Sequence, residues 1–247
     1  VGNLYTVNID GTGLTRLTSF VSGGSPGGAF WPCWNATGTS IAFAGSMVSG
    51  GTSYYQIFTV NSSGGALTQV THVVPGGTPA SAAYPAWNPM NNTIYFTGVV
   101  PRLGEVAPQL FRINADGSAL AQVTNFSAGS DPERAEDCEV SHDGTTLVFA
   151  GGRVIGGEDQ YQVYRMPTGG GTVTRLTNLP SVGPYTGAAY PTWYRDDTVI
   201  NFAGYIRVGD SNQSQLFEIN AGGGTPVQLT NFFMGGSPQS GISPSSR

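Results

Sequence analysis

One short segment of this sequence carries an unusual density of carboxylates. Five of the fifteen acidic residues lie within nine positions, namely Asp131, Glu133, Glu136, Asp137 and Glu139. Carboxylate oxygens are hard ligands that can bind a cation, and they also accept hydrogen bonds from sugar hydroxyls. We therefore expect these five residues to form a ligand-binding site. The competing interpretation is a solvated acidic loop that Arg134 partly neutralises.

The other reactive side chains do not assemble into a catalytic or metal-binding set. Glycosidase chemistry needs two carboxylates that flank the scissile bond on rigid elements. In the repeat described below, five equivalent positions of the first strand could supply such carboxylates, but only Glu139 is acidic. The five are Cys33, Ala86, Glu139, Thr192 and Ser245. The histidines, His72 and His142, supply neither a metal cluster nor a catalytic relay. The sequence thus predicts no enzyme, no metal site and no cofactor, although a structural cation such as calcium stays open.

Five Asn-x-Ser/Thr sequons are candidate glycosylation sites. All of them fall in expected turns or loops, as acceptors should: Asn35, Asn61, Asn91, Asn125 and Asn212. Asparagine, serine and threonine are so frequent here that chance alone would give about three sequons. The motif therefore matters only if the source organism glycosylates exported proteins.

Composition narrows the class of protein. The 247 residues carry a net charge of −5, and the ten basic residues are all arginine. No basic patch appears, so nucleic acid is not expected as a partner. No apolar run approaches 18 residues, so we expect no membrane span, and no signal peptide is recognised. The weakly charged, Ser/Thr/Gly-rich chain favours an extracellular or periplasmic location.

The elements that position these side chains belong to a repeat with a period of 53 residues. Pairs of an apolar and an aromatic residue recur at Leu4–Tyr5, Ile57–Phe58, Leu110–Phe111, Val163–Tyr164 and Leu216–Phe217. Threonine recurs at Thr18, Thr71, Thr124, Thr177 and Thr230. A glutamine precedes four of the pairs, at Gln56, Gln109, Gln162 and Gln215. Self-similarity of this kind is the signature of a repeat architecture.

Each repeat is expected to contain four strands. In the copy from 30 to 72 they are predicted over residues 30–34, 40–44, 56–60 and 67–71. A turn is expected at 35–38, a polar loop up to Ser53 and a hairpin turn at 61–65. Four-stranded sheets repeated at this period indicate β-propeller blades. Long loops such as 19–29 and 98–108 would mark the binding face.

The repeat count predicts an all-β, five-bladed propeller that forms a single domain over residues 1–247. Residues 1–29 would supply strands three and four of a closing blade, and 240–247 its first strand. The complete blades are expected at 30–82, 83–135, 136–188 and 189–239. The shared blade would be three-stranded and would leave an open edge, which invites a strand from another chain. The alternative is that the sequence is truncated.

The repeat resembles the TolB-type, or WD40-like, propeller repeat. The stretches that carry the resemblance are Ala83-Tyr84-Pro85-Ala86-Trp87-Asn88 and Leu110-Phe111-Arg112-Ile113-Asn114-Ala115-Asp116-Gly117. The resemblance covers the whole chain and implies the propeller fold. The family includes periplasmic adaptors, propeller domains of peptidases and many exported proteins, so it does not by itself fix the function.

Three functions are weighed against each other. The first is a non-catalytic structural, assembly or protein-interaction subunit, which could polymerise through the incomplete blade. The second is a module that binds glycans or a partner protein with the long-loop face, or a TolB-like periplasmic adaptor. The third, least favoured, is an enzyme of polysaccharide metabolism. The expected partners are other protein chains, including copies of this one, and glycans.

Overall fold

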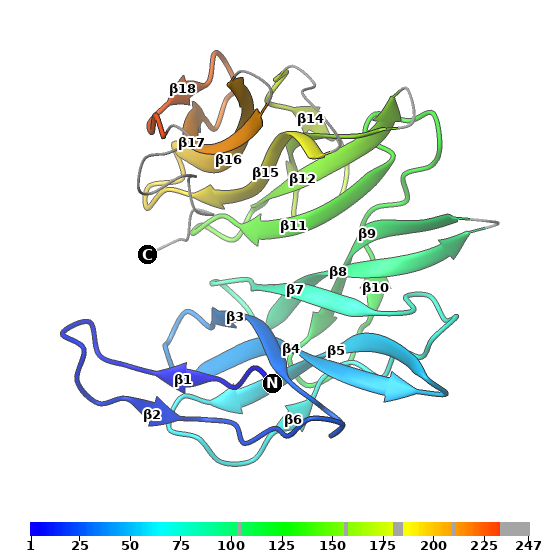
Figure 1. Cartoon of the computed structure of the whole chain (residues 1–247), viewed down its shortest axis with the longest axis vertical. Coiled ribbons are helices and arrows are strands. Elements are labelled where there is room, and N and C mark those ends of the chain that lie inside the picture. The colour runs from blue at the N-terminus through cyan, green and yellow to red at the C-terminus, as the bar shows by residue number, and fades with distance from the viewer. Residues whose placement is uncertain (103–104, 156–157, 180–184, 209–210, 233–247) are drawn as a thin grey trace. The chain divides into compact units, whose positions relative to one another are not determined.

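The computed structural model describes all residues except 103–104, 156–157, 180–184, 209–210 and 233–247 (Figure 1). The described residues form strands and turns, and among them no helix is long and apolar enough to cross a membrane. The chain divides into two compact units, Val1–Val123 and Thr124–Arg247. The expected closing strand at 240–247 lies outside the described residues.

The first unit contains three antiparallel sheets. A two-stranded sheet pairs β1 (Tyr5–Thr6) with β2 (Thr15–Arg16). Blade 1 consists of β3 (Ala29–Trp34), β4 (Ser40–Ser49), β5 (Thr52–Asn61) and β6 (Thr68–Gln69). Blade 2 consists of β7 (Ala82–Trp87), β8 (Thr93–Arg102), β9 (Glu105–Asn114) and β10 (Ala121–Gln122). Each blade therefore has the four-stranded order that the repeat predicts.

The second unit contains two blades of the same design. Blade 3 consists of β11 (Arg134–Val140), β12 (Thr146–Ile155), β13 (Glu158–Pro167) and β14 (Thr174–Arg175). Blade 4 consists of β15 (Tyr185–Trp193), β16 (Val199–Val208), β17 (Ser211–Asn220) and β18 (Val227–Gln228). Short parallel pairing of β13 with β15, from Asp159 opposite Tyr185 to Tyr161 opposite Gly187, joins these blades into one sheet.

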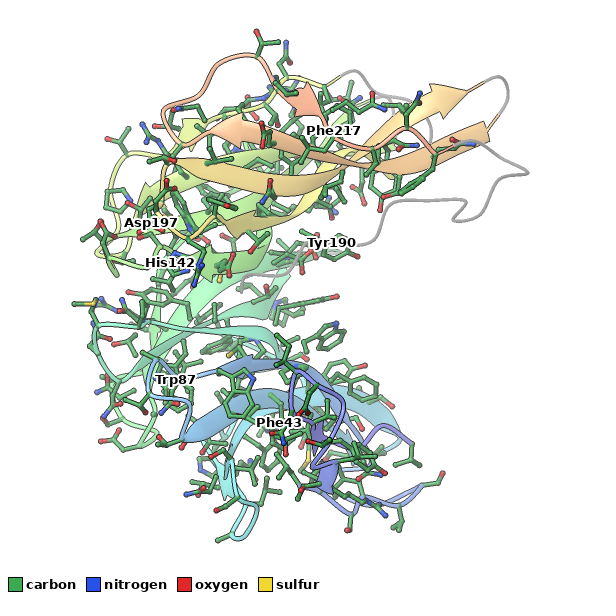
Figure 2. All side chains as sticks on the ribbon, turned by 90° about the vertical axis from the view of Figure 1, so that its left-hand side faces the viewer. Phe43, Trp87, His142, Tyr190, Asp197 and Phe217 are labelled. Atoms are coloured by element: carbon green, nitrogen blue, oxygen red, sulfur yellow. The ribbon has the colours of Figure 1, made fainter. Side chains whose placement is uncertain are left out.

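A ring stacked on a ring forms the centre of every blade. The buried phenylalanine of the second strand stacks on the aromatic residue of the third, with ring centroids 5.6–5.8 Å apart. The four pairs are Phe43–Phe58, Phe96–Phe111, Phe149–Tyr164 and Phe202–Phe217, of which Figure 2 labels Phe43 and Phe217. Burial of such large apolar groups stabilises each sheet.

The central strands run further than the sequence predicts. Most of the loops expected at Gly45–Ser53 and Gly98–Pro108 is paired backbone among the described residues. β4 pairs with β5 as far as Ser49 and Thr52, and β8 with β9 as far as Arg102 and Glu105. The glycines in these segments suggested loops, although glycine is also required within the strands. A Cβ atom on Gly45 would lie 2.6 Å from Cδ2 of Phe58, so this strand position must be glycine to admit the ring.

Glutamine and threonine fasten the fourth strand to the third. Thr71 donates to Oε1 of Gln56 (2.7 Å), while the Gln56 amide donates to the carbonyl of Val73 (2.5 Å). The backbone nitrogens of Ile57 and Val73 donate to the same two side chains (2.8 and 3.0 Å). The set recurs at Gln162 and at Gln215. This satisfaction of buried polar groups explains why both residues keep their phase in the repeat.

Candidate functional site

The first strand of every blade contains a β-bulge with a left-handed residue at its centre. The register shifts between Phe30 and Cys33 in β3, and at the equivalent place in the other blades. The residues with positive φ are Trp31 (50°), Tyr84 (50°), Asp137 (53°) and Tyr190 (52°). None of them is glycine, so each pays a conformational cost of about 1–2 kcal/mol. Bulges re-aim side chains, and this one presents a large or charged group from each blade.

In the first unit the bulge positions build an aromatic cluster, defined here as Phe30, Trp31, Tyr55 and Tyr84. The ring centroids of Trp31 and Tyr84 lie 4.2 Å apart, which brings the bulges of blades 1 and 2 into contact. Phe30, Trp31 and Tyr55 lie 5.2–5.8 Å from one another, mostly edge to face. The rings pack on each other and remain partly exposed, with Phe30 at 36%. The cluster therefore offers an aromatic platform.

In the second unit the equivalent positions build an acidic cluster, defined here as Glu136, Asp137, Tyr161, Tyr190 and Tyr205. Glu136 and Tyr161 occupy the repeat positions of Phe30 and Tyr55, and their side chains are hydrogen-bonded. Asp137 and Tyr190 occupy the positions of Trp31 and Tyr84. The same local geometry thus presents carboxyl and phenol groups in place of packed rings.

Burial dominates the electrostatics of the acidic cluster. It raises the pKa of Asp137 to about 8, and the neighbouring Glu136 carboxylate adds to the rise. Burial also raises the pKa of Glu136, against the opposing effects of the Tyr161 hydrogen bond and the Arg134 charge. The pKa values of Tyr190 and Tyr205 are raised, first by burial and then by Asp137. Asp137 is therefore mostly protonated at neutral pH and can donate a hydrogen bond.

The other three predicted ligand residues lie apart from this pair and bond to their own surroundings. Asp131 accepts a hydrogen bond from the Tyr164 hydroxyl and lies 3.3 Å from Nη1 of Arg175. Glu133 accepts hydrogen bonds from the backbone nitrogens of Gly129 (3.0 Å) and Val154 (3.3 Å). These contacts stabilise the loop before β11, so the structure does not gather the predicted set around one point.

Glu139 contacts the next blade. Its Oε2 accepts a hydrogen bond from the backbone nitrogen of Trp193 at 2.7 Å, and its carbonyl accepts one from the indole nitrogen at 3.4 Å. Arg134, which in the competing interpretation partly neutralises the acidic segment, pairs with Asp159 at 2.9 Å. Among the described residues, no group of three or more His, Cys, Asp or Glu side chains could hold a metal ion. Cys33 and Cys138 are both thiols.

Four sequon asparagines lie in turns or loops or at the end of a strand, and one lies within a strand. Asn61, Asn91 and Asn125 are exposed, whereas Asn35 is half-buried and donates from Nδ2 to the Thr39 hydroxyl at 3.0 Å. Asn212 was expected in a loop but lies in β17, because the extended central hairpin of blade 4 reaches Val208 and Ser211.

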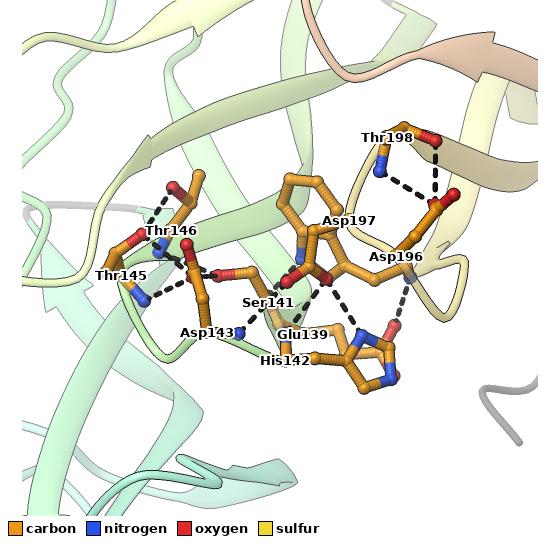
Figure 3. Close-up of polar contacts among 10 residues, drawn as sticks. Glu139, Ser141, His142, Asp143, Thr145, Thr146, Asp196, Asp197 and Thr198 are labelled. Atoms are coloured by element: carbon orange, nitrogen blue, oxygen red, sulfur yellow. Dashed lines mark hydrogen bonds and ion pairs between the residues drawn. The ribbon is translucent and has the colours of Figure 1, made fainter.

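A second contact between blades 3 and 4 escaped the sequence analysis. Oδ1 of Asp197 accepts a hydrogen bond from the backbone nitrogen of His142 (2.9 Å) and lies 2.8 Å from Nδ1 of the His142 ring (Figures 2 and 3). Oδ2 of Asp197 accepts a hydrogen bond from the backbone nitrogen of Asp143 at 3.0 Å. Asp197 has a positive φ of 56°, at the repeat position where Gly38 and Gly144 stand. The sequence signal that could have indicated this contact is an aspartate at a repeat position where two other blades have glycine.

The tyrosines of the acidic cluster were also missed. Tyr161 directly precedes the recurring Gln162, and it stands two repeats after Tyr55. Tyr190 stands two repeats after Tyr84. Comparing the repeats position by position, rather than scanning for acids, would have placed both beside Glu136 and Asp137.

Comparison with known proteins identifies the fold. No family model and no curated protein matches the sequence. TolB from Acinetobacter baumannii is 22% identical, with a TM-score of 0.64 over 93% of this chain and 49% of that one. A protein assigned as TolB from Agrobacterium tumefaciens is 17% identical, with a TM-score of 0.71 over 94% of this chain and 75% of that one. The chain has a TolB-like β-propeller fold.

A protease offers a more distant match. The β-propeller domain of the trilobed protease from Pyrococcus furiosus is 10% identical, with a TM-score of 0.51 over 82% of this chain and 57% of that one. The match is to a propeller domain, so it carries no peptidase activity over to this chain. This chain spans about half the length of the Acinetobacter protein. The expected TolB-like propeller repeat is confirmed, whereas the five-blade count and the shared blade stay predictions.

Proposed function

We propose that the chain is a non-catalytic propeller of the periplasm or cell exterior that acts as a protein-interaction subunit. The observation that carries the proposal is the bulge of the first strand, which holds Trp31, Tyr84, Asp137 and Tyr190 at positive φ in four blades. A strained conformation that recurs in four sequence-diverged copies, and that presents an aromatic ring in three of them, is typical of a functional surface. Aromatic side chains are also the residue type most enriched at protein interfaces.

The acidic residues support a non-catalytic role. Asp131, Glu133 and Glu139 are committed to backbone groups, arginines or a tyrosine of the fold itself. The remaining neighbours, Glu136 and Asp137, are consecutive in one strand. They do not stand on opposite sides of a space in which a glycosidic bond could be placed.

Site-specific photo-crosslinking in the native host tests the proposal. A photoreactive phenylalanine analogue would replace Tyr84 in one variant and Tyr190 in another, with exposed Met90 as the control position. We expect one defined partner protein to crosslink at both bulge positions and not at Met90. Purified partner should then bind the unmodified chain and lose at least about tenfold in affinity to Tyr190→Ala. Equal crosslinking at all three positions would contradict the proposal.

Self-association is a second candidate, favoured by apolar side chains on the two-stranded sheet. Val7 and Leu14, beside β1 and β2, are 56% and 68% exposed, and Ile9 at the turn between these strands is also exposed. The edges of a small sheet with apolar neighbours can act as templates for pairing with another chain. Sedimentation velocity of Ile9→Ser/Leu14→Ser against the unmodified chain tests it. A monomer in both, at every concentration up to about 100 μM, would remove this candidate.

A further inference from the structure

The two-stranded sheet of β1 and β2 has the geometry of the outer half of a blade. The backbone nitrogen of Leu4 donates to the Thr18 hydroxyl at 2.9 Å, and the Leu4 carbonyl accepts from the Leu17 nitrogen at 2.9 Å. In blade 1, one repeat later, the nitrogen of Ile57 donates in the same way to the Thr71 hydroxyl at 2.8 Å. β1 and β2 therefore occupy the places of a third and a fourth strand.

The edge of β1 that faces away from β2 has no strand beside it among the described residues. In blade 1 the equivalent edge of β5 pairs with β4 from Ser40 to Ser49. Backbone groups alternate in direction along a strand, and the Leu4 carbonyl points to β2, so those of Tyr5 and Val7 point to the open edge. Unpaired donors and acceptors at a sheet edge are a template for an added strand.

The side chains of Tyr5 and Val7 lack the cover that their counterparts have. Tyr5 is 52% exposed, whereas Phe58 at the same position of blade 1 is 3% exposed. Val7 is 56% exposed, whereas Val60 is 2% exposed. Both positions are buried in the other three blades as well, at Phe111, Ile113, Tyr164, Met166, Phe217 and Ile219. The exposure is thus specific to the sheet that has no second strand beside its third.

The four complete blades show which residues fill the place of the second strand. Each second strand carries the pattern Ile/Leu-x-Phe-x-Gly, at residues 41–45, 94–98, 147–151 and 200–204. In blade 1, Phe43 lies directly opposite Phe58 and stacks on it, and Ile41 lies opposite Val60. Gly45 leaves room for the same ring, since a Cβ atom there would lie 2.6 Å from Cδ2 of Phe58.

We propose that the open edge of β1 accepts an extended Ile/Leu-x-Phe-x-Gly strand from a partner protein, antiparallel to β1. The register of the complete blades places the phenylalanine opposite Tyr5, the isoleucine or leucine opposite Val7, and the glycine opposite Asn3. The pattern occurs four times in the 247-residue sequence, and each copy already has a strand on both sides within its blade. A partner protein, rather than a second copy of this chain, therefore supplies the strand.

This surface differs from the bulge positions that carry the proposed function, and its occupant differs from the second copy of the self-association candidate. The ring and the glycine of the added strand give it a sequence requirement. Main-chain hydrogen bonds would supply affinity, whereas the ring opposite Tyr5 would supply specificity. The requirement can be tested with peptides, without altering the protein.

A fluorescently labelled peptide with the sequence of residues 40–49 and a lysine tail for solubility is the probe, with binding to the full chain followed by fluorescence anisotropy. We expect saturable binding at one site. A peptide with Phe43→Ser lacks the ring that would face Tyr5, and one with Gly45→Val places a branched side chain against it. Each should bind at least about tenfold more weakly than the unmodified peptide.

Variants of the chain then locate the site. Val7→Pro removes a backbone donor from the open edge and should weaken binding at least about tenfold. Leu14→Ser is the control, because its counterpart Leu67 is exposed even in the complete blade 1, and it should bind the peptide normally. Saturating peptide should also slow hydrogen exchange of residues 2–9, as measured by mass spectrometry.

No binding of the unmodified peptide, equal affinity of the three peptides, or unchanged affinity in Val7→Pro would overturn the proposal. Tyr190→Ala, which tests the bulge surface, leaves this edge intact and should bind the peptide normally. The strand acceptor and the proposed function can therefore fail separately.

Discussion

Asp197 binds His142 of the preceding blade through both its backbone nitrogen, at 2.9 Å, and its ring nitrogen Nδ1, at 2.8 Å. The carboxylate stands where blades 1 and 3 have Gly38 and Gly144 and blade 2 has Asn91, and its backbone adopts a positive φ of 56°. The contact therefore connects two blades at the cost of local backbone strain. The balance can be measured with substitutions that separate the two effects.

Asp197→Ala removes the hydrogen bonds and keeps the strained φ, so we expect a loss of about 2–3 kcal/mol in the free energy of unfolding. Asp197→Gly removes the same hydrogen bonds but relieves the strain, and should be less destabilising by about 1 kcal/mol. Urea unfolding of the two variants gives the comparison. Equal stabilities would mean that the backbone at this position is not strained.

Gly151→Ala should destabilise the second unit by roughly 2–3 kcal/mol, because the added Cβ would lie 2.6 Å from Cε2 of Tyr164 and 2.9 Å from Cβ of Pro132. Gly169→Ala is the matched control, since a Cβ there meets nothing within 4 Å and φ is not positive. Thermal unfolding followed by circular dichroism distinguishes them. A Gly151 variant as stable as the Gly169 variant would contradict the close approach of the ring.

Gln162→Leu should cost about 3 kcal/mol, because it leaves the Thr177 hydroxyl and both backbone groups of Leu179 without their buried partner. The control is Gln228→Ala, which removes an exposed side chain with one hydrogen bond to the Thr230 carbonyl. That variant should stay within about 0.5 kcal/mol of the unmodified chain. Similar losses in both would show that the buried network adds no stability of its own.

Asp143 provides a pH effect of the opposite sign to that of Asp137. Its pKa is lowered, first by the hydrogen bond from the Ser141 hydroxyl at 2.6 Å and then by those from Thr145. The resulting stabilisation is present above the ordinary pKa of aspartate and is lost as the pH falls through the lowered value. In Ser141→Ala the pKa of Asp143 should rise, as followed by carbon-13 NMR of the carboxyl group. Asp196 should titrate unchanged in the same spectra.

Residues that recur at the repeat period are located correctly from the sequence. The prediction fails where one residue type, such as glycine, occurs both in loops and in strands. Gln56 and Thr71 keep their phase because they hydrogen-bond to each other, so periodicity locates them correctly. Gly45 suggests a loop, yet it belongs to a strand because Phe58 needs the space above it. The positive φ of Trp31 was invisible, since nothing in an indole side chain marks a left-handed backbone.

The acidic segment shows the same limit at the candidate site. Proximity in sequence groups Asp131, Glu133 and Glu139 with Glu136 and Asp137, but alternation along β11 and the loop before it sends them to different neighbours. The phenols of Tyr161 and Tyr190 come from other strands, which no local scan brings together. Aligning the repeats with one another is the sequence comparison that would place these tyrosines beside Glu136 and Asp137.

The ring above each strand glycine restricts how duplicated copies of this repeat could diverge. A larger residue at Gly151 requires a smaller one at Tyr164, so neither partner can mutate alone without passing through a damaged intermediate. The end of the ring that points away from the glycine can vary more easily, and there blade 3 has tyrosine where the other blades have phenylalanine. The added hydroxyl contacts Asp131, a residue of the segment that differs most from its siblings. Blade 3 thus makes a polar contact at the end of the ring that the glycine does not confine.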